Sequence, residues 1–312
     1  MPDNFGVMIM RFFTFSRFLL WASITIFSTC IAARDNQQTN QNSIHNKLKD
    51  LETAAGGRIG ISVINTDNNQ KIEYRADERF PMGSTFKVML VATVLKQSMT
   101  NDQLLQQKVT YTKEDIATWS PITEKHITDG MTILELCAAT IMYSDNTAAN
   151  LLLQQLGGSE PVTAFARSIG DNTYNLNSGE AELKSIPGDF DYTSTPAAME
   201  KSLQQIIFSN ALGSQQKEHL LNWMKANTTG DLRIRAGTPK TWVVADKTGS
   251  GDYGLTNDIG ILYPPKCKPI IATIYFIQNK KEATGRPDIL ASATRILINE
   301  LAQTDQCIKN NL

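Results

Sequence analysis

The sequence predicts an α+β fold: a five-stranded antiparallel sheet with flanking helices, joined to an all-helical lobe. Two observations lead to this prediction. Strand-like stretches lie at both ends of the chain, two before residue 80 and three after residue 240. The part between them carries the signals of helices. Since the terminal strands pair most simply in one sheet, we expect the middle of the chain to form a second lobe.

The first residues are typical of a secretory signal peptide. Arg11 and Arg17 precede an apolar run over residues 18–27, and small residues follow it. We expect this leader to comprise residues 1–32 and the mature protein to be exported to the periplasm, without stable membrane association. Because the run is short for a membrane span, a membrane anchor is the less favoured alternative, as is a lipid attached to Cys30.

The mature chain begins with a polar stretch and a short amphipathic helix over residues 44–53. Apolar residues then alternate with others from 58 to 65, and a second run, 71–75, follows after a turn rich in asparagine and aspartate. Alternation on both sides of such a turn predicts a β-hairpin.

The middle of the chain is expected to be helical. An apolar run from Ser84 to Leu95 predicts a buried helix, and Thr132 with Glu135 forms the pattern of a capping box. Further helices are predicted over residues 147–156, 161–170, from 196 onward and 215–226. Residues 171–195 form a long polar loop, and a loop of this length in a compact domain is usually functional.

Strand signals return towards the C-terminus. Three runs, 241–247, 258–263 and 270–276, are joined by turns, and a final helix is predicted over 287–302. The lobe with the sheet is therefore predicted to comprise residues 33–80 and 228–312, and the helical lobe residues 81–227.

The composition excludes several classes of function. The chain has 30 basic and 31 acidic residues, and this balance provides no footprint for nucleic acid or an anionic membrane surface. Its three histidines are widely separated and its cysteines lack Cys-x-x-Cys spacing, so we expect no metal site. No disulfide framework follows from the cysteines outside the leader, because their number is odd. Cys137 is most simply a core residue, and whether Cys267 and Cys307 are free stays open.

The helix predicted from Ser84 carries a hydroxyl and an amine in its first turn. Residues three positions apart share a helix face, so Ser84 and Lys87 can touch. A lysine in an apolar setting loses proton affinity, and its neutral amine can accept the proton of a serine. Backbone N–H groups at a helix start also favour an anion near the Ser84 oxygen. Alone, however, a Ser-x-x-Lys pattern is common by chance.

Two further motifs give this pattern a context. A Ser-Asp-Asn motif at residues 144–146 stands at the break between two predicted helices, and a Lys-Thr-Gly motif at 247–249 ends a predicted strand. Each is weak alone, since the first is an ordinary turn and a lysine at a strand end is usually solvated. In this order, the three motifs are the signature of active-site-serine enzymes that open β-lactams.

On these motifs, the mature sequence resembles the class A β-lactamases over nearly its whole length. Residues 227–235 are similar to the family segment that places a carboxylate-binding arginine, here Arg233, near the lysine strand. Residues 247–258 are similar to the cefotaximase branch. The resemblance implies the two-lobe serine β-lactamase and penicillin-binding fold and hydrolysis of penicillins and cephalosporins. We expect a monomer that acts on these small molecules without cofactor or metal.

The resemblance also implies a role for each matching residue. Ser84 attacks the lactam carbonyl, and the backbone N–H groups of Ser84 and Ser250 form the oxyanion hole. Lys87 helps to deprotonate Ser84, and Ser144 passes a proton to the departing ring nitrogen. The substrate-binding residues are Asn146 for the acyl amide, Lys247, Thr248, Ser250 and Arg233 for the carboxylate, and Trp119 as an aromatic wall at the cleft mouth. Simple core packing is the alternative role of Trp119.

Deacylation requires a general base, which the resemblance places in the long loop. Glu180 and Glu182 stand in a Glu-x-Glu-Leu-Lys sequence where the family has Glu-x-Glu-Leu-Asn. We expect Glu180 to activate water, with Glu182 as the second candidate and a plain surface glutamate as the alternative. Ser178 and Tyr192 stand where the family has an arginine and an aspartate that clamp the loop, so we expect a differently braced loop and slow turnover of some substrates.

Two other functions fit the same motifs. A penicillin-binding D,D-peptidase acts on cell-wall peptide, and a β-lactam sensor domain is acylated without turnover. The chain length, the single leader and the loop glutamates favour the hydrolase. Many turnovers of a chromogenic cephalosporin per protein molecule indicate hydrolysis, whereas a single stoichiometric burst indicates a sensor or a peptidase.

Overall fold

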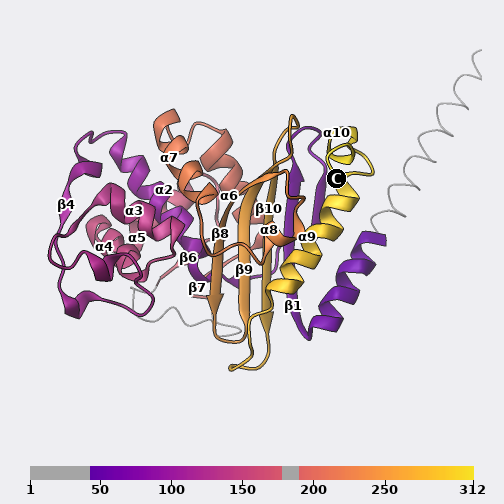
Figure 1. Cartoon of the computed structure of the whole chain (residues 1–312), viewed down its shortest axis with the longest axis horizontal. Coiled ribbons are helices and arrows are strands. Elements are labelled where there is room, and N and C mark those ends of the chain that lie inside the picture. The colour runs from indigo at the N-terminus through magenta and orange to yellow at the C-terminus, as the bar shows by residue number, and fades with distance from the viewer. Residues whose placement is uncertain (1–42, 178–189) are drawn as a thin grey trace, which may run out of the picture. The chain divides into compact units, whose positions relative to one another are not determined.

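Figure 1 shows a computed structural model of the chain, which describes residues 43–177 and 190–312. Residues 1–47 are a unit of their own, in which the described residues are helical. The fold that follows is that of residues 48–312, which form one compact unit.

Some of the predicted features lie outside the described ranges. They are the leader over residues 1–32 with Cys30, the loop position Ser178, and the candidate bases Glu180 and Glu182. In the part of the chain that is described, no helix combines the length and the apolar character needed to cross a membrane.

The centre of the fold is a five-stranded antiparallel sheet with the strand order β2-β1-β10-β9-β8. Its strands are β1 (Gly57–Asn65), β2 (Lys71–Tyr74), β8 (Val243–Gly251), β9 (Leu255–Tyr263) and β10 (Ile270–Gln278). Strand β1 pairs directly with β10, so that Ile61 lies opposite Ile274. This pairing joins the two ends of the chain in one sheet and confirms the predicted α+β fold.

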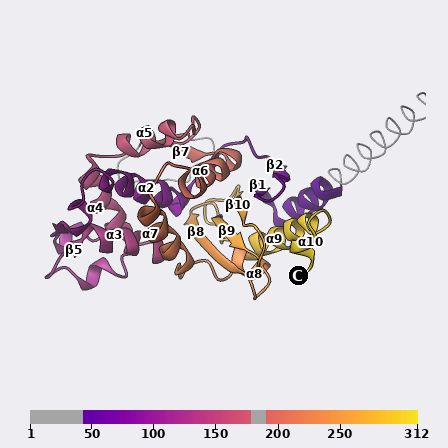
Figure 2. The ribbon, with the colours of Figure 1, turned by 90° about the horizontal axis from the view of Figure 1, so that it is seen from above.

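Helices cover both faces of this sheet (Figure 2). Helix α6 (Pro196–Phe208) packs against β1 and β10 on one face, and α9 (Pro287–Leu301) packs against β9 and β10 on the other. The short helices α8 (Ile234–Gly237) and α10 (Gln306–Lys309) lie beside α9. Strands β9 and β10 are consequently buried along almost their whole length.

The middle of the chain is mainly helical, as predicted, and is built around α2 (Lys87–Ser98), which is buried from Lys87 to Leu95. Four helices pack around α2: α3 (Ile133–Met142), α4 (Asn146–Leu156), α5 (Glu160–Ser168) and α7 (Ser214–Lys225). The capping box predicted at Thr132 and Glu135 begins α3. The exact bounds of the two lobes stay a prediction.

Several short elements in this region were not predicted. Two-residue and three-residue strands form a small sheet from β3 (Phe80–Pro81), β7 (Tyr192–Ser194) and β6 (Asn175–Leu176), and a pair from β4 (Lys108–Val109) and β5 (Met131–Thr132). The described residues also form four 3₁₀ turns: η1 (Gly83–Phe86), η2 (Leu104–Gln106), η3 (Lys113–Asp115) and η4 (Thr123–Lys125). Such elements are too short to show a period in the sequence.

Several boundaries also differ from the prediction, and two of them bear on the site. The helix expected to begin at Ser84 starts as the 3₁₀ turn η1, and α2 begins at Lys87. Strand β8, which was expected to end at Lys247, continues to Gly251. The extension arises because Thr248, Gly249 and Ser250 pair with β9, and glycine within a strand hides such pairing in the sequence.

A disulfide bond joins Cys267 to Cys307 and thereby ties the segment after β9 to α10. The same region is held by Trp242 Nε1, which donates a hydrogen bond to the carbonyl oxygen of Asn311 (2.9 Å). Sequence reasoning left the state of these two cysteines open, since the third, Cys137, made their number odd. The structure buries Cys137 as a free thiol in the helical region.

Replacing both Cys267 and Cys307 by serine is expected to lower the free energy of unfolding by about 2–4 kcal/mol. The bond closes a loop of 40 residues in the unfolded chain, and its loss gives that chain more conformations. Urea unfolding of the oxidised protein and of the double variant measures the difference. A reductant should destabilise the wild type and leave the double variant unchanged; an unchanged wild type contradicts the prediction.

Candidate active site

Ser84 lies in η1, directly after a glycine that adopts a left-handed backbone conformation (Gly83, φ 51°). The segment before it is held by β9, because Asn257 Nδ2 donates to the carbonyl oxygens of Pro81 (2.7 Å) and Met82 (3.1 Å). Ser84 itself is partly exposed, whereas its neighbours are buried. The hydroxyl therefore faces a boundary between the packed interior and solvent.

Strand β8 approaches the Ser84 backbone very closely at Gly249. A Cβ atom on Gly249 would lie 2.6 Å from the Met82 carbonyl oxygen and 3.2 Å from Ser84 N. A Cβ atom on Gly83 would in turn lie 3.1 Å from Ser250 N. These two glycines permit the contact that brings the amides of Ser84 and Ser250 to the same place.

Lys87 is fully buried, with 1% of its surface exposed, one helical turn after Ser84. Its Nζ donates to the carbonyl oxygen of Ser144 (2.7 Å) and to Asn146 Oδ1 (2.6 Å). Within the described chain, Ser84 Oγ is not among its acceptors. Burial, together with the nearby charge of Lys247, lowers the pKa of Lys87 well below its usual value, while Asp145 opposes this change.

Ser144 joins this lysine to a second one. Its Oγ accepts hydrogen bonds from Lys247 Nζ (3.0 Å) and Lys87 Nζ (3.4 Å), and its backbone is left-handed (φ 57°). Lys247 is also fully buried, and burial lowers its pKa to about 7. The charge of Arg233 also lowers this pKa, whereas Asp246 and Asp258 raise it. The predicted motifs therefore meet in one hydrogen-bonded group, Lys87–Ser144–Lys247.

The turn that carries Ser144 is fixed by Asp145. This buried carboxylate accepts from the backbone N–H groups of Ile122 (3.0 Å) and Thr123 (3.0 Å), from Thr123 Oγ1 (2.9 Å), and from Ala148 N (2.8 Å) at the start of α4. A carboxylate with this many donors is held rigidly. It consequently sets the direction of the serine before it and of Asn146 after it.

Asn146 and Trp119 lie at the exposed edge of this turn. Asn146 Nδ2 donates to the carbonyl oxygen of Thr118 (2.7 Å), and its backbone N–H donates to that of Trp119 (3.0 Å). The Trp119 side chain is 62% exposed, and its Nε1 donates to the Tyr143 carbonyl oxygen (3.0 Å). The alternative of simple core packing for Trp119 is therefore wrong.

Arg233 reaches strand β8 from the start of α8. Its guanidinium donates to Ser250 Oγ (2.6 Å) and to the carbonyl oxygen of Gly249 (2.7 Å). Burial lowers the pKa of Arg233, while Asp258 and Asp246 oppose this change. Beside it on the strand, the Thr248 hydroxyl is hydrogen-bonded to the hydroxyl of Thr229. Cationic and hydroxyl groups thus follow one another along β8, where an anion can bind.

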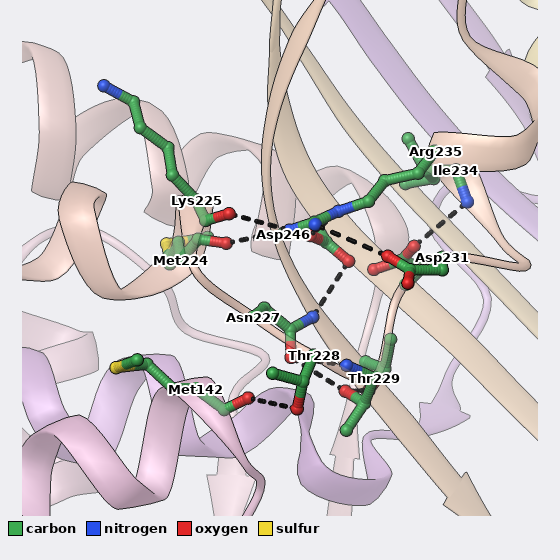
Figure 3. Close-up of polar contacts among 12 residues, drawn as sticks. Met142, Met224, Lys225, Asn227, Thr228, Thr229, Asp231, Ile234, Arg235 and Asp246 are labelled. Carbon is green, nitrogen blue, oxygen red and sulfur yellow. Dashed lines mark hydrogen bonds and ion pairs between the residues drawn. The ribbon is translucent and has the colours of Figure 1, made fainter. Parts of the chain in front are cut away.

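A buried polar network that was not predicted supports this strand (Figure 3). Asp246, the residue before Lys247, accepts hydrogen bonds from Arg235 Nε (2.8 Å) and Asn227 Nδ2 (3.0 Å). Arg235 also donates to the carbonyl oxygens of Met224 and Lys225 at the end of α7 (both 3.2 Å). The network links α7, α8 and β8 directly behind the lysine.

A second carboxyl, Asp258, lies in the same interior. Its Oδ2 accepts from the backbone N–H of Ile234 (3.1 Å), and its buried Oδ1 has no hydrogen-bond partner in the described part of the chain. Burial raises the pKa of Asp258 well above its usual value, and Asp246 raises it further. Burial raises the pKa of Asp246 as well, but Arg235 and Asn227 lower it, so Asp246 is the better compensated of the two buried carboxyls.

The predicted site residues that the structure describes lie together. One predicted contact is not formed among them, because Ser84 Oγ is not hydrogen-bonded to Lys87. Glu180 lies outside the described residues. No group of three or more His, Cys, Asp or Glu side chains that could hold a metal ion occurs within residues 43–177 and 190–312. Of the missed residues, Asp246 has a signal in the sequence, since it is a charged residue at the end of an apolar strand run, whereas Arg235 stands among other charged residues and has none.

Comparisons with known proteins identify what this chain is similar to. A family described as "Beta-lactamase enzyme family" matches residues 43–301. The beta-lactamase OXY-2 of Klebsiella oxytoca is 52% identical over 260 residues, which cover 83% of this chain and 90% of that protein. The beta-lactamase CTX-M-97 of Escherichia coli is 50% identical over 257 residues, covering 82% and 88%. A crystal structure of a beta-lactamase from Desulfarculus baarsii has a TM-score of 0.82 and 43% identity, covering 84% of this chain and 98% of that chain.

Replacing Arg235 by leucine is expected to lower the free energy of unfolding by about 3–5 kcal/mol, because it leaves the Asp246 carboxylate buried with a single neutral donor. Arg286→Ala is the matched control, since Arg286 pairs with Asp288 on the surface, where the loss is about 0–1 kcal/mol. Equilibrium urea unfolding of both variants measures the two changes. Equal changes in the two variants contradict the role given to the buried pair.

Proposed function

This chain belongs to the beta-lactamase enzyme family, and on that basis we propose how its residues open and release a β-lactam. It is a class A β-lactamase that hydrolyses the β-lactam amide. The observation that carries the proposed mechanism is the buried group Lys87–Ser144–Lys247, which lies beside the partly exposed Ser84.

In the first step, Ser84 Oγ attacks the lactam carbonyl carbon and becomes acylated. Lys87 is proposed to accept the serine proton in its neutral form, which is favoured because burial and the charge of Lys247 lower its pKa. As no hydrogen bond joins the two groups in the described chain, a small movement of either side chain precedes the transfer. The N–H groups of Ser84 and Ser250 bind the developing oxyanion, and each such donor contributes about 3–4 kcal/mol in comparable sites.

Ser144 completes the ring opening. Its hydroxyl is hydrogen-bonded to both lysines, so a proton can pass from a lysine through Ser144 to the departing ring nitrogen. The carbon–nitrogen bond breaks as the proton arrives, and the acyl group stays on Ser84. Asp145 keeps the hydroxyl in place during this transfer because four donors fix its carboxylate.

The substrate carboxylate is proposed to bind along β8. Lys247 and Arg233 supply positive charge, and the hydroxyls of Thr248 and Ser250 supply hydrogen bonds. Arg233 acts partly through Ser250, whose hydroxyl it already contacts. Asn146 holds the acyl amide of the substrate with the amide hydrogen that Thr118 does not use, and Trp119 forms the exposed aromatic wall.

Deacylation is proposed to use Glu180 as the general base for water, with Glu182 as the second candidate. This role for Glu180 is supported by the match of the loop sequence to the family pattern. Apart from these two glutamates, none of the predicted site residues is a candidate base for water. A D,D-peptidase or a sensor is not favoured, since relatives at about half identity are beta-lactamases over most of their length.

The finer assignments are also proposals. Residues 247–258 favour the cefotaximase branch and its cephalosporins, although relatives of the OXY and CTX-M types are about equally similar. The apolar leader and its arginines support export to the periplasm, cleavage near residue 32, and no stable membrane association thereafter. A monomer is the expected form, with no cofactor or metal.

Glu180→Gln is expected to stop turnover after acylation, because glutamine cannot accept the proton of the deacylating water. With a chromogenic cephalosporin, the wild type should give many turnovers and the variant a single burst. Mass spectrometry should then find a stable acyl group on Ser84 in the variant.

Ser84→Ala is the control, and it should give neither the burst nor the adduct. Glu182→Gln tests the second candidate in the same way. Continued turnover by Glu180→Gln removes Glu180 from its role, and a single burst by the wild type replaces the hydrolase with a sensor.

A further inference from the structure

A small three-stranded sheet lies immediately before the nucleophile. Its strand order is β3-β7-β6, with Pro81 of β3 opposite Thr193 of β7, and Leu176 of β6 opposite Tyr192 of β7. Strands β6 and β7 belong to the two limbs of the predicted loop over residues 171–195. The base of this loop is therefore hydrogen-bonded to the segment that leads into Ser84.

Tyr192 makes two direct contacts with that segment. Its carbonyl oxygen accepts a hydrogen bond from the backbone N–H of Met82 (3.1 Å), and its hydroxyl donates to the carbonyl oxygen of Gly83 (2.8 Å). The Tyr192 ring also packs edge-on against Phe86, with ring centroids 5.4 Å apart. The side chain is 4% exposed, so water does not compete for the hydroxyl.

The carbonyl of Gly83 and the N–H of Ser84 belong to one planar peptide unit. A hydrogen bond that fixes the direction of the carbonyl therefore fixes the direction of the N–H as well. Gly83 needs such a restraint, because its left-handed backbone is one of several conformations that glycine adopts easily. No other side chain in the described residues donates a hydrogen bond to this carbonyl.

Arg79 holds the two limbs of the loop base together. Its guanidinium donates to the carbonyl oxygen of Thr173 (2.8 Å), before β6, and to Thr193 Oγ1 (2.9 Å) on β7. It also lies 5.7 Å from the ring centroid of Phe190. Arg79 thus keeps β7, and with it Tyr192, in register with the nucleophile segment.

We propose that Tyr192 is a positioning residue for Ser84: its hydroxyl holds the peptide unit that supplies the Ser84 N–H to the oxyanion hole. This inference rests on the proposed function of Ser84 as the nucleophile. The tyrosine stands where the family resemblance expects an aspartate that clamps the loop. In this chain, the loop base is braced by Arg79, and position 192 serves the nucleophile directly.

The hydroxyl remains a donor over a wide range of pH. Burial raises the pKa of Tyr192 well above its usual value, and the nearby Tyr174 and Tyr275 raise it further. The contribution of Tyr192 to acylation should therefore not depend on pH in the working range of the enzyme, unlike that of a titrating base.

Tyr192→Phe tests the proposal, because it removes the hydroxyl and keeps the ring against Phe86. The acylation rate constant, measured in single turnover with a chromogenic cephalosporin, is expected to fall about tenfold. The same fall should appear at about pH 6 and pH 8. The mass spectrum gives the fraction of protein molecules that become acylated. The rate constant is then taken from these reactive molecules alone, so that it does not depend on the yield of folded protein.

A change in rate without a change in binding distinguishes positioning from a general structural effect. The dissociation constant of the intact cephalosporin, measured with Ser84→Ala and with Ser84→Ala/Tyr192→Phe, should differ by less than about twofold, because the oxyanion contact strengthens only as charge develops. Equal weakening of binding and acylation would instead assign Tyr192 a purely structural role and overturn the proposal.

Tyr174→Phe is the matched control. Tyr174 is fully buried in the first limb of the same loop, and its hydroxyl has no hydrogen-bond partner among the described residues. Its loss should leave acylation unchanged. Acylation of Tyr192→Phe at the wild-type rate overturns the positioning role, whereas a wild type that is not acylated at Ser84 overturns the proposed function instead.

Discussion

The structure depends on burying two lysine side chains against one serine hydroxyl. Lys87 and Lys247 both contact Ser144 Oγ, and neither is open to water. Two positive charges this close, in an interior of low dielectric, strongly disfavour their joint ionisation. The pKa of each falls below its usual value. The packing itself thus favours the neutral form of a lysine amine beside a serine, which is the form that the proposed acyl transfer uses.

The rest of the interior limits how far the two lysines can relax. Asp145, held by four donors, fixes the turn that carries Ser144, and Asp246, held by Arg235 and Asn227, fixes the strand that carries Lys247. Each carboxylate also supplies negative charge that opposes the fall in lysine pKa. Positioning and electrostatic compensation therefore come from the same two groups.

The sequence predicts the sheet and the helical middle because long periodic segments decide them, and the motif that contains Ser144 falls correctly at a break between helices. Contacts set by tertiary packing were not predictable in the same way. The role of Tyr192 depends on strands too short to show a period. The bond between Cys267 and Cys307 depends on a distance that their spacing does not encode. The site residues could be predicted because three motifs occur together in one chain, since each motif alone is common.

The proposed acylation depends most on a lowered pKa of Lys87, which lets this lysine accept the proton of Ser84. Its titration can be followed by NMR in protein labelled with ¹³C at the lysine ε-carbon, with Lys87→Arg to assign the resonance. We expect a midpoint well below the ordinary 10.5, because burial and the charge of Lys247 lower the pKa of Lys87. A midpoint near 10.5 would mean that Lys87 stays charged, and it would contradict its role as the acceptor of the Ser84 proton.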